Sequence, residues 1–445
     1  MKKLIFLILA AAGLVAAFPA GAQQLYYPPA REAYEADPTI VRGNYTLYDF
    51  DTPAPTPAPK GFKPCYISTY NRHGARTYGS NSGYDSWYAV LKAAAADDML
   101  TPAGKELHDI FMALYPRVQL RGGDLTEIGH RQLRLLGMRM WKAYPDLFRK
   151  HPVIDARSTT VPRVMLSMIE FCDGLKTCDP TLDITQTASQ VDRSYLNPLS
   201  STNPNTIPAD RDIESGKDSY RRAYHALMND HIDADALLGR FLKDLSYAEK
   251  GGRSTRMDLC RLLFNVAVDL PCVTDEYDLT HFLTSDELFC FWRAENFRFY
   301  SVAGRTPVHR GRNWALEERL LRSIVETAEA DLADGKVQVR LRFGHDFYLI
   351  GLATLLDIDG WNIEEPDPEK VDAVFRHYCS PTAMNMQFIF YRNDLGDILV
   401  RTTLNDREVR FPIAGFEGPY YPWTSFRAYC NSRLSVAKEI LSSTK

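Results

Sequence analysis

Two strand-like runs stand on either side of a long stretch with helical spacing of apolar residues, and this order limits the folds that the chain can adopt. Residues 65–70 (CYISTY) form a short β-prone run, and residues 336–343 (KVQVRLRF) alternate as a second strand. Between them, the stretch from about Gln190 to Leu332 carries apolar residues at helical spacing. Strands that are far apart in sequence can share one sheet only if the helical middle is carried as an insertion. We therefore predict an α/β domain interrupted by a mostly helical part.

The first residues have the layout of a secretory signal peptide. Lys2 and Lys3 precede an apolar run from residue 4 to residue 17, and small residues (AGA) stand at 20–22. We predict that residues 1–22 are removed and that the mature chain is exported, to the periplasm or beyond. No later run is long, apolar and free of charge enough to span a bilayer, so no membrane association is expected once the signal is removed.

The charge balance limits the possible partners. The chain has 52 Lys and Arg against 56 Asp and Glu, a formal net charge of −4. Without a global basic field, nucleic acid and anionic membranes are not expected as partners. An anionic ligand would have to be bound by a local cluster of cations.

Eight cysteines in an exported chain, none of them in a CxxC pair, indicate partial disulfide pairing rather than metal ligation. Cys172 with Cys178 is a candidate pair because the two are close in sequence. Cys379 with Cys430 is a second candidate because the two are expected to be neighbours. The sequence does not determine the connectivity.

Charged residues follow a predicted strand and precede a predicted helix at three places. Residues 72–76 (RHGAR) follow the first strand, and residues 344–346 (GHD) follow the later one. The third place holds Arg157 and Arg163, and Pro162 opens the next helix there. Arg163 thus falls in a first helical turn, where backbone N–H groups favour an anion. Because ligands bind at the carboxyl ends of strands in open α/β sheets, we expect these residues to converge.

Three arginines and two histidines in one crevice suit a tetrahedral dianion such as phosphate. A histidine among them can attack phosphorus to form a phosphohistidine, and Asp346 can protonate the leaving oxygen. Each element also has a purely structural interpretation, as a turn cap or a solvated helix charge, but their common placement favours a site. A metal bound by His73 and His345 is disfavoured because the arginines would repel a cation. Motifs of P-loop, serine-hydrolase, zincin and Rossmann enzymes are absent from the sequence.

These residues resemble the histidine acid phosphatase branch of the histidine phosphatase superfamily. The signature of that branch is RHGxRxP near the N-terminus and an HD or HAE pair late in the chain. Besides RHGAR and GHD, the chain has LTEIGHRQ, similar to LTxxGxxQ, and ARSTTVPRVMLSMIEFCDGL, similar to RSTxxxRxxxSxxxFxxGL. In the first of these two, Thr126 is expected to cap a helix that begins at about Glu127.

The resemblance implies a role for each matching residue. His73 would be the nucleophile and Asp346 the proton donor, with neither a metal nor another cofactor. Arg157 would be a supporting neighbour. The residues that would bind the phosphoryl group are Arg72, Arg76, Arg163 and His345.

The implied fold is a phosphoglycerate-mutase-like three-layer α/β/α domain with a central mixed sheet and an inserted helical domain. The corresponding division is a signal peptide (1–22), the N-terminal part of the catalytic domain (23–175), a mostly helical inserted domain (176–335) and the C-terminal part of the catalytic domain (336–445).

The stretches LRFGHDFYLIGLATLL and DILVRTTLNDREVRFPI are most similar to multiple inositol polyphosphate phosphatases, which implies phytate or lower inositol phosphates as small-molecule substrates. Two residues depart from the patterns: that subfamily has His-Ala-Glu where this chain has His345-Asp346, and Tyr78 replaces the proline of the signature. The alternatives are a broad-specificity acid phosphatase or sugar-phosphatase, and a non-catalytic phosphoester-binding protein. Helical-part cations that could contact further phosphates, or simply be solvated, are Arg221, Arg222, Arg305, Arg310 and Arg312.

Overall fold

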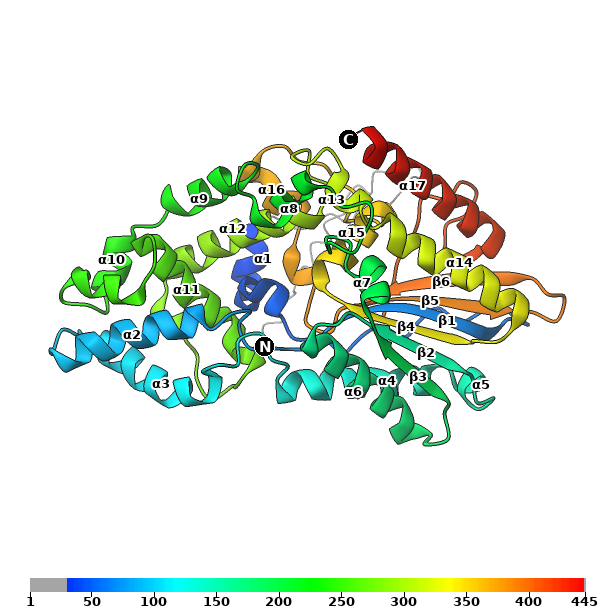
Figure 1. Ribbon diagram of the computed structural model, residues 1–445, viewed down its shortest axis with the longest axis horizontal. Coiled ribbons are helices and arrows are strands. Elements are labelled where there is room, and N and C mark those ends of the chain that lie inside the picture. Colours follow the sequence, from blue (N-terminus) through cyan, green and yellow to red (C-terminus); the bar gives the residue numbers. More distant parts are fainter. Residues whose placement is uncertain (1–29, 444–445) are drawn as a thin grey trace, which may run out of the picture.

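The computed structural model describes residues 30–443, so the predicted signal peptide lies outside the described residues. A sheet covered by helices on both faces forms one side of the molecule, and a region of helices forms the other (Figure 1). Within residues 30–443, no helix is both long enough and apolar enough to cross a membrane.

A mixed sheet of eight strands forms the centre of the α/β part. The strand order is β3-β2-β4-β1-β5-β6-β7, and β8 pairs with β6. The first four strands in this order are parallel, and β5 to β8 add antiparallel pairs. The bounds are β1 (Lys63–Arg72), β2 (Ile154–Ser158), β3 (Ile184–Ala188), β4 (Val339–Gly344), β5 (Asn385–Arg392), β6 (Ile398–Leu404), β7 (Arg407–Glu408) and β8 (Tyr420–Pro422).

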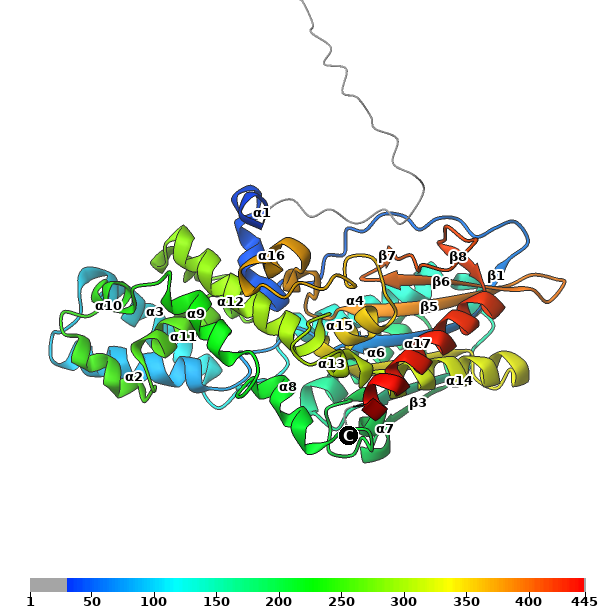
Figure 2. The same ribbon diagram turned by 90° about the horizontal axis from the view of Figure 1, so that it is seen from above.

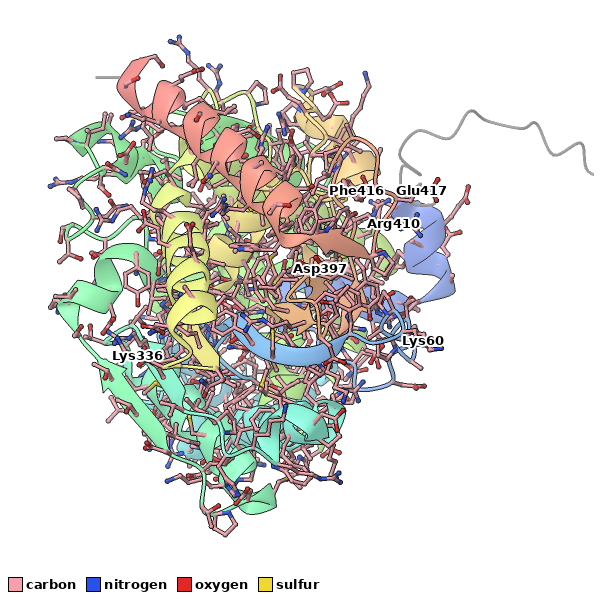
Figure 3. The ribbon with its side chains drawn as sticks, turned by 90° about the vertical axis from the view of Figure 1, so that its right-hand side faces the viewer. Lys60, Lys336, Asp397, Arg410, Phe416 and Glu417 are labelled. Carbon is pink, nitrogen blue, oxygen red and sulfur yellow. The ribbon has the colours of Figure 1, made fainter. Side chains whose placement is uncertain are left out.

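The predicted α/β architecture is confirmed, because strands from both ends of the chain share this sheet. β1 pairs with β4 in parallel, and Arg72 at the end of β1 lies opposite Gly344 at the end of β4. The other end of the sheet points away from the helical region. Figure 3 shows that end, where the exposed side chains of Lys60, Lys336 and Asp397 lie.

Helices cover both faces of the sheet (Figures 1 and 2). α4 (Glu127–Ala143) and α6 (Pro162–Cys178) pack together on one face; α14 (Glu318–Asp334), α15 (Asp346–Leu355) and α17 (Trp423–Ser443) cover the other. As predicted, Thr126 caps α4, and its side chain accepts a hydrogen bond from the Gly129 N–H. Leu133, Phe171 and Phe343 belong to the core cluster between α4, α6 and the sheet.

The helical region also includes helices from outside residues 176–335, the range predicted for the inserted domain. α2 and α3 come from before residue 176, whereas β3 and α14 come from within 176–335 and belong to the sheet side. β3 was missed because it is an edge strand with half-exposed polar side chains, so its sequence lacks a clear alternation. The division into domains remains a proposal. The helices outside the sheet layers are α1 (Ala30–Ala36), α2 (Ser82–Ala96), α3 (Pro102–Val118), α8 (Arg211–Ser215), α9 (Arg221–Asn229), α10 (Ala234–Gly239), α11 (Arg256–Asp269), α12 (Ser285–Ala303) and α16 (Val371–Val374).

All eight cysteines are free in the structure, and neither predicted disulfide is present. Cys172 and Cys178 both lie in α6. Six residues of α-helix separate two Cα atoms by about 9 Å along the axis, which is farther than a disulfide can span. Closeness in sequence was therefore the wrong criterion for this pair. Cys379 and Cys430 are likewise free.

Candidate active site

The parallel pairing of β1 and β4 brings the two histidine motifs together. The His73 N–H donates to the carbonyl oxygen of Gly344 at 3.2 Å, so His73 and His345 leave the sheet side by side. Their ring centroids are 5.5 Å apart, and the rings are nearly perpendicular. Both histidines thus stand at the carboxyl ends of adjacent strands, as expected.

Arg72 is fully buried beneath this pair. One terminal nitrogen, Nη1, donates to the carbonyl oxygens of Asn44 and Ser380, each at 2.7 Å. The other, Nη2, lies 2.9 Å from Oδ2 of Asp346 and forms an ion pair with it. Arg72 is therefore fixed from three sides and links β1 to the first residue of α15.

Asp346 has a second partner that the sequence did not reveal. The side-chain amide of Asn44 donates to Oδ2 of Asp346 at 2.9 Å. Burial raises the pKa of Asp346, but Arg72, Asn44 and Arg76 outweigh burial and bring the pKa to about 2. The carboxyl group is therefore ionised when the site holds no ligand.

Asn44 reaches this position through a kinked 3-10 helix (Pro38–Tyr45). At the kink Gly43 has a φ of 54°, and a Cβ there would lie 1.8 Å from Nε2 of His377. Only glycine fits this approach. No motif marks the segment, so sequence reasoning could not place it at the site.

Within the described part of the chain, one ring nitrogen of His73 forms a hydrogen bond with the backbone, and the other does not. Nδ1 lies 2.9 Å from the carbonyl oxygen of Gly74. A carbonyl can only accept, so Nδ1 carries the proton and Nε2 keeps its lone pair. Burial lowers the pKa of His73 well below its usual value, and the charges of Arg72 and Arg163 lower it further. The ring is thus a neutral imidazole with a free Nε2.

The charges of the remaining predicted arginines act on the same two histidines. Burial lowers the pKa of His345 to about 3, and Arg163 contributes to that shift. Burial, followed by the charge of Arg76, lowers the pKa of Arg163 to about 10, so Arg163 stays charged at neutral pH. The Nε atoms of Arg76 and Arg163 are buried and have no hydrogen-bond partner within the described part of the chain. Buried guanidinium donors of this kind suit an anionic ligand.

Arg157, the expected supporting neighbour, has other partners. Its guanidinium forms ion pairs with Asp155 at 2.9 Å and with Asp192 at 3.1 Å. Its charge is therefore already neutralised by two carboxylates beside β2. The structure shows no contact between Arg157 and the histidines.

The LTEIGHRQ motif supports the loop that carries His73. The side chain of Gln132 accepts from the Ala75 N–H at 2.9 Å and donates to the Thr382 hydroxyl at 2.9 Å. The Thr126 N–H donates to the carbonyl oxygen of Ala75 at 3.0 Å. Gly129 lets α4 approach this loop, because a Cβ there would lie 2.2 Å from the same oxygen. The motif acts by holding the loop in place.

A cavity of about 370 Å³ is lined by Asn44 and Arg76 and by residues of the helical region. Of the five helical-part arginines considered from the sequence, Arg221 lines it. Arg305 and Arg312 instead pair with Asp357 and Asp210. Lining cations that sequence reasoning missed are Arg42, Arg261 and Arg298. In the described part of the chain, no group of three or more His, Cys, Asp or Glu side chains could hold a metal ion.

The family model of the histidine phosphatase superfamily (branch 2) matches residues 71–405. The chain belongs to this superfamily, and its fold and family define a phosphatase. No curated protein matches the sequence.

Solved structures with a similar fold include a multiple inositol polyphosphate phosphatase from Bifidobacterium longum in complex with inositol hexasulfate. It is 16% identical over 88% of this chain and 97% of its own, with a TM-score of 0.73. The phytase from D. castellii is 14% identical over 89% of this chain and 85% of its own, with a TM-score of 0.64. A Hafnia alvei phytase is 14% identical over 85% of this chain and 99% of its own, with a TM-score of 0.53.

Proposed function

We propose that this chain is an exported phosphomonoesterase that hydrolyses inositol phosphates through a phosphohistidine on His73. The observation that carries the proposal is the neutral His73 ring, whose Nε2 is free and whose pKa is lowered by burial and by the charges of Arg72, Arg163 and Arg76. The predicted signal peptide supports export to the periplasm or the medium.

In the first step, Arg72, Arg76 and Arg163 bind the non-bridging phosphoryl oxygens, and His345 stands beside them. Nε2 of His73 attacks phosphorus while the bond to the leaving oxygen breaks. The leaving oxygen takes a proton from Asp346 and departs as the alcohol. In the second step, water attacks the phosphohistidine and gives its proton to Asp346, which releases phosphate and the neutral ring.

Asp346 must gain a proton before the first step, because its pKa is about 2 in the free site. A bound phosphate group adds negative charge beside the carboxylate and shares Arg72 with it, and both effects raise the pKa of Asp346. A substrate that binds as its monoanion brings the required proton with it. The buried ion pair thus keeps the acid ionised until substrate arrives.

Two observations support inositol phosphates as the substrate class. The structurally similar Bifidobacterium longum enzyme is a multiple inositol polyphosphate phosphatase and binds inositol hexasulfate. The cavity beside the phosphoryl site is lined by Arg42, Arg76 and Arg221. The alternative is a broad-specificity acid phosphatase or sugar-phosphatase, since Asp346 by itself does not select a leaving group.

Phosphate release tests the proposal directly. The mature chain is assayed without added metal on phytate, an inositol trisphosphate, glucose 1-phosphate and an aryl phosphate, at pH 5 and 7. We expect turnover that His73→Ala abolishes, whereas His231→Ala, a change at a partly exposed histidine, retains it. A preference for inositol phosphates of less than about threefold in kcat/KM, under roughly 1 kcal/mol, would remove the inositol substrate and leave the phosphatase. Tight phosphate binding without hydrolysis would instead indicate a binding protein.

A further inference from the structure

Three carboxylates from the helical region line the cavity beside the phosphoryl site: Glu214, Asp258 and Glu295. Glu295 is held by Arg298 at 2.8 Å and by the hydroxyl of Tyr224 at 2.6 Å. Its charge is therefore neutralised within the wall.

Asp258 is also engaged in the wall of the cavity. Its carboxylate accepts a hydrogen bond from the hydroxyl of Thr255 at 2.9 Å and lies 3.8 Å from the guanidinium of Arg261. Asp258 and Glu295 thus offset Arg261 and Arg298. The cations that remain for a ligand in this cavity are Arg42, Arg76 and Arg221.

Glu214 differs from the other two carboxylates. Within residues 30–443, its side chain has neither a hydrogen bond nor an ion pair shorter than 4.0 Å. Its backbone is fixed, because the Tyr220 hydroxyl donates to the Glu214 carbonyl oxygen at 2.8 Å. Glu214 is exposed to solvent, and its carboxyl group is only partly shielded; this partial burial raises its pKa, Arg298 lowers it, and Asp346 raises it further. Glu214 thus lines the same cavity as Asn44 and Arg76, and no cation pairs with its carboxylate within the described residues.

An unpaired carboxylate at this place distinguishes a leaving group that carries a free hydroxyl from one that carries a further phosphate. A hydroxyl on the substrate can donate to it and form a charge-assisted hydrogen bond. A phosphate group at the same place meets a like charge, which is unfavourable. Glu214 thus favours a polyol that carries a free hydroxyl in this part of the cavity.

We propose that Glu214 is a specificity-determining residue that accepts a hydrogen bond from a free hydroxyl of the leaving polyol and disfavours a phosphate there. It makes partly dephosphorylated inositol phosphates better substrates than phytate. This inference rests on the proposed function, since it assigns the substrate class of the same site.

The test compares Glu214→Gln with wild type in kcat/KM for phytate, an inositol monophosphate and an aryl phosphate. Glutamine keeps the shape and removes the charge. We expect phytate turnover to rise at least tenfold relative to the monophosphate, with the aryl phosphate changed less than twofold. The matched control is Asp218→Asn, which removes one charge from an exposed residue that does not line the cavity.

Each outcome is decisive. An unchanged ratio in Glu214→Gln overturns the inference while leaving the phosphatase standing. An equal shift in Asp218→Asn also overturns it, because the effect would then be one of net charge. If wild type hydrolyses none of the esters, the proposed function fails and this inference fails with it. Equal unfolding midpoints for wild type and both variants establish that the comparison is between folded proteins.

Discussion

Replacing Gly129 by alanine tests whether α4 positions the nucleophile. A Cβ at this position would lie 2.2 Å from the carbonyl oxygen of Ala75, two residues after His73. Real Cβ atoms stay at least 3.0 Å from such an atom, so helix and loop must separate by about 0.8 Å (from 2.2 to 3.0 Å). The obstacle is backbone, which cannot rotate away as a side chain can.

Overpacking of this kind costs about 1–3 kcal/mol of unfolding free energy. A displacement of nearly 1 Å in a nucleophile costs about 10²-fold in rate. We therefore expect Gly129→Ala to lose both stability and activity. The assays are urea unfolding and kcat/KM on an aryl phosphate, measured well below the unfolding temperature.

Gly137→Ala is the matched control in the same helix. A Cβ there would lie 2.1 Å from the carbonyl oxygen of Phe171, which is a clash of the same size between α4 and α6. Both variants gain the same helix propensity, so their stability losses are expected to be similar. Gly129→Ala clashes with the His73 loop itself, whereas the clash of Gly137→Ala lies about two turns farther along α4, so Gly137→Ala is expected to keep activity within about fivefold of wild type. Equal activity in the two variants would refute the positioning role.

Three further predictions concern the site itself. His73→Ala is expected to lower kcat by roughly 10⁴-fold or more and to abolish the acid-labile phosphoenzyme trapped from radiolabelled substrate; a remaining phosphoenzyme would exclude His73 as nucleophile. Asp346→Asn is expected to cost about 10²–10⁴-fold on alkyl phosphates and much less on an aryl phosphate, whose leaving group needs no proton, so equal losses would exclude a proton donor. The pKa of His345 is about 3 in the folded protein, against about 6.5 in an unfolded chain. Between these two values the unfolded chain binds a proton at His345 that the folded protein does not bind. The free energy of unfolding therefore falls as the pH drops from about 6.5 towards 3, by up to about 1.4 kcal/mol per pH unit. His345→Gln should flatten the dependence of urea unfolding on pH, and an unchanged slope would contradict a neutral His345 ring.

The sequence predicted those parts of the site that depend on local order. A strand that ends in RHGAR and another that ends in GHD place charged side chains at the same edge of a parallel sheet, so His73 and His345 could be expected to meet. The first turn of α6 could be predicted from Pro162, and it carries Arg163. Because these features depend on strand and helix ends, a single chain reveals them.

Local patterns along the chain were therefore enough to predict an α/β sheet accompanied by a mostly helical part, and to predict that His73 and His345 lie side by side. The structure was needed to find that Asn44 holds Asp346, that Asp155 and Asp192 neutralise Arg157, and that Glu214 lines the cavity. The physical reason is that each of these side chains gains its role from a partner distant in sequence or on another element. Periodicity and motifs describe local backbone order, whereas such contacts are fixed by the packing of the whole chain.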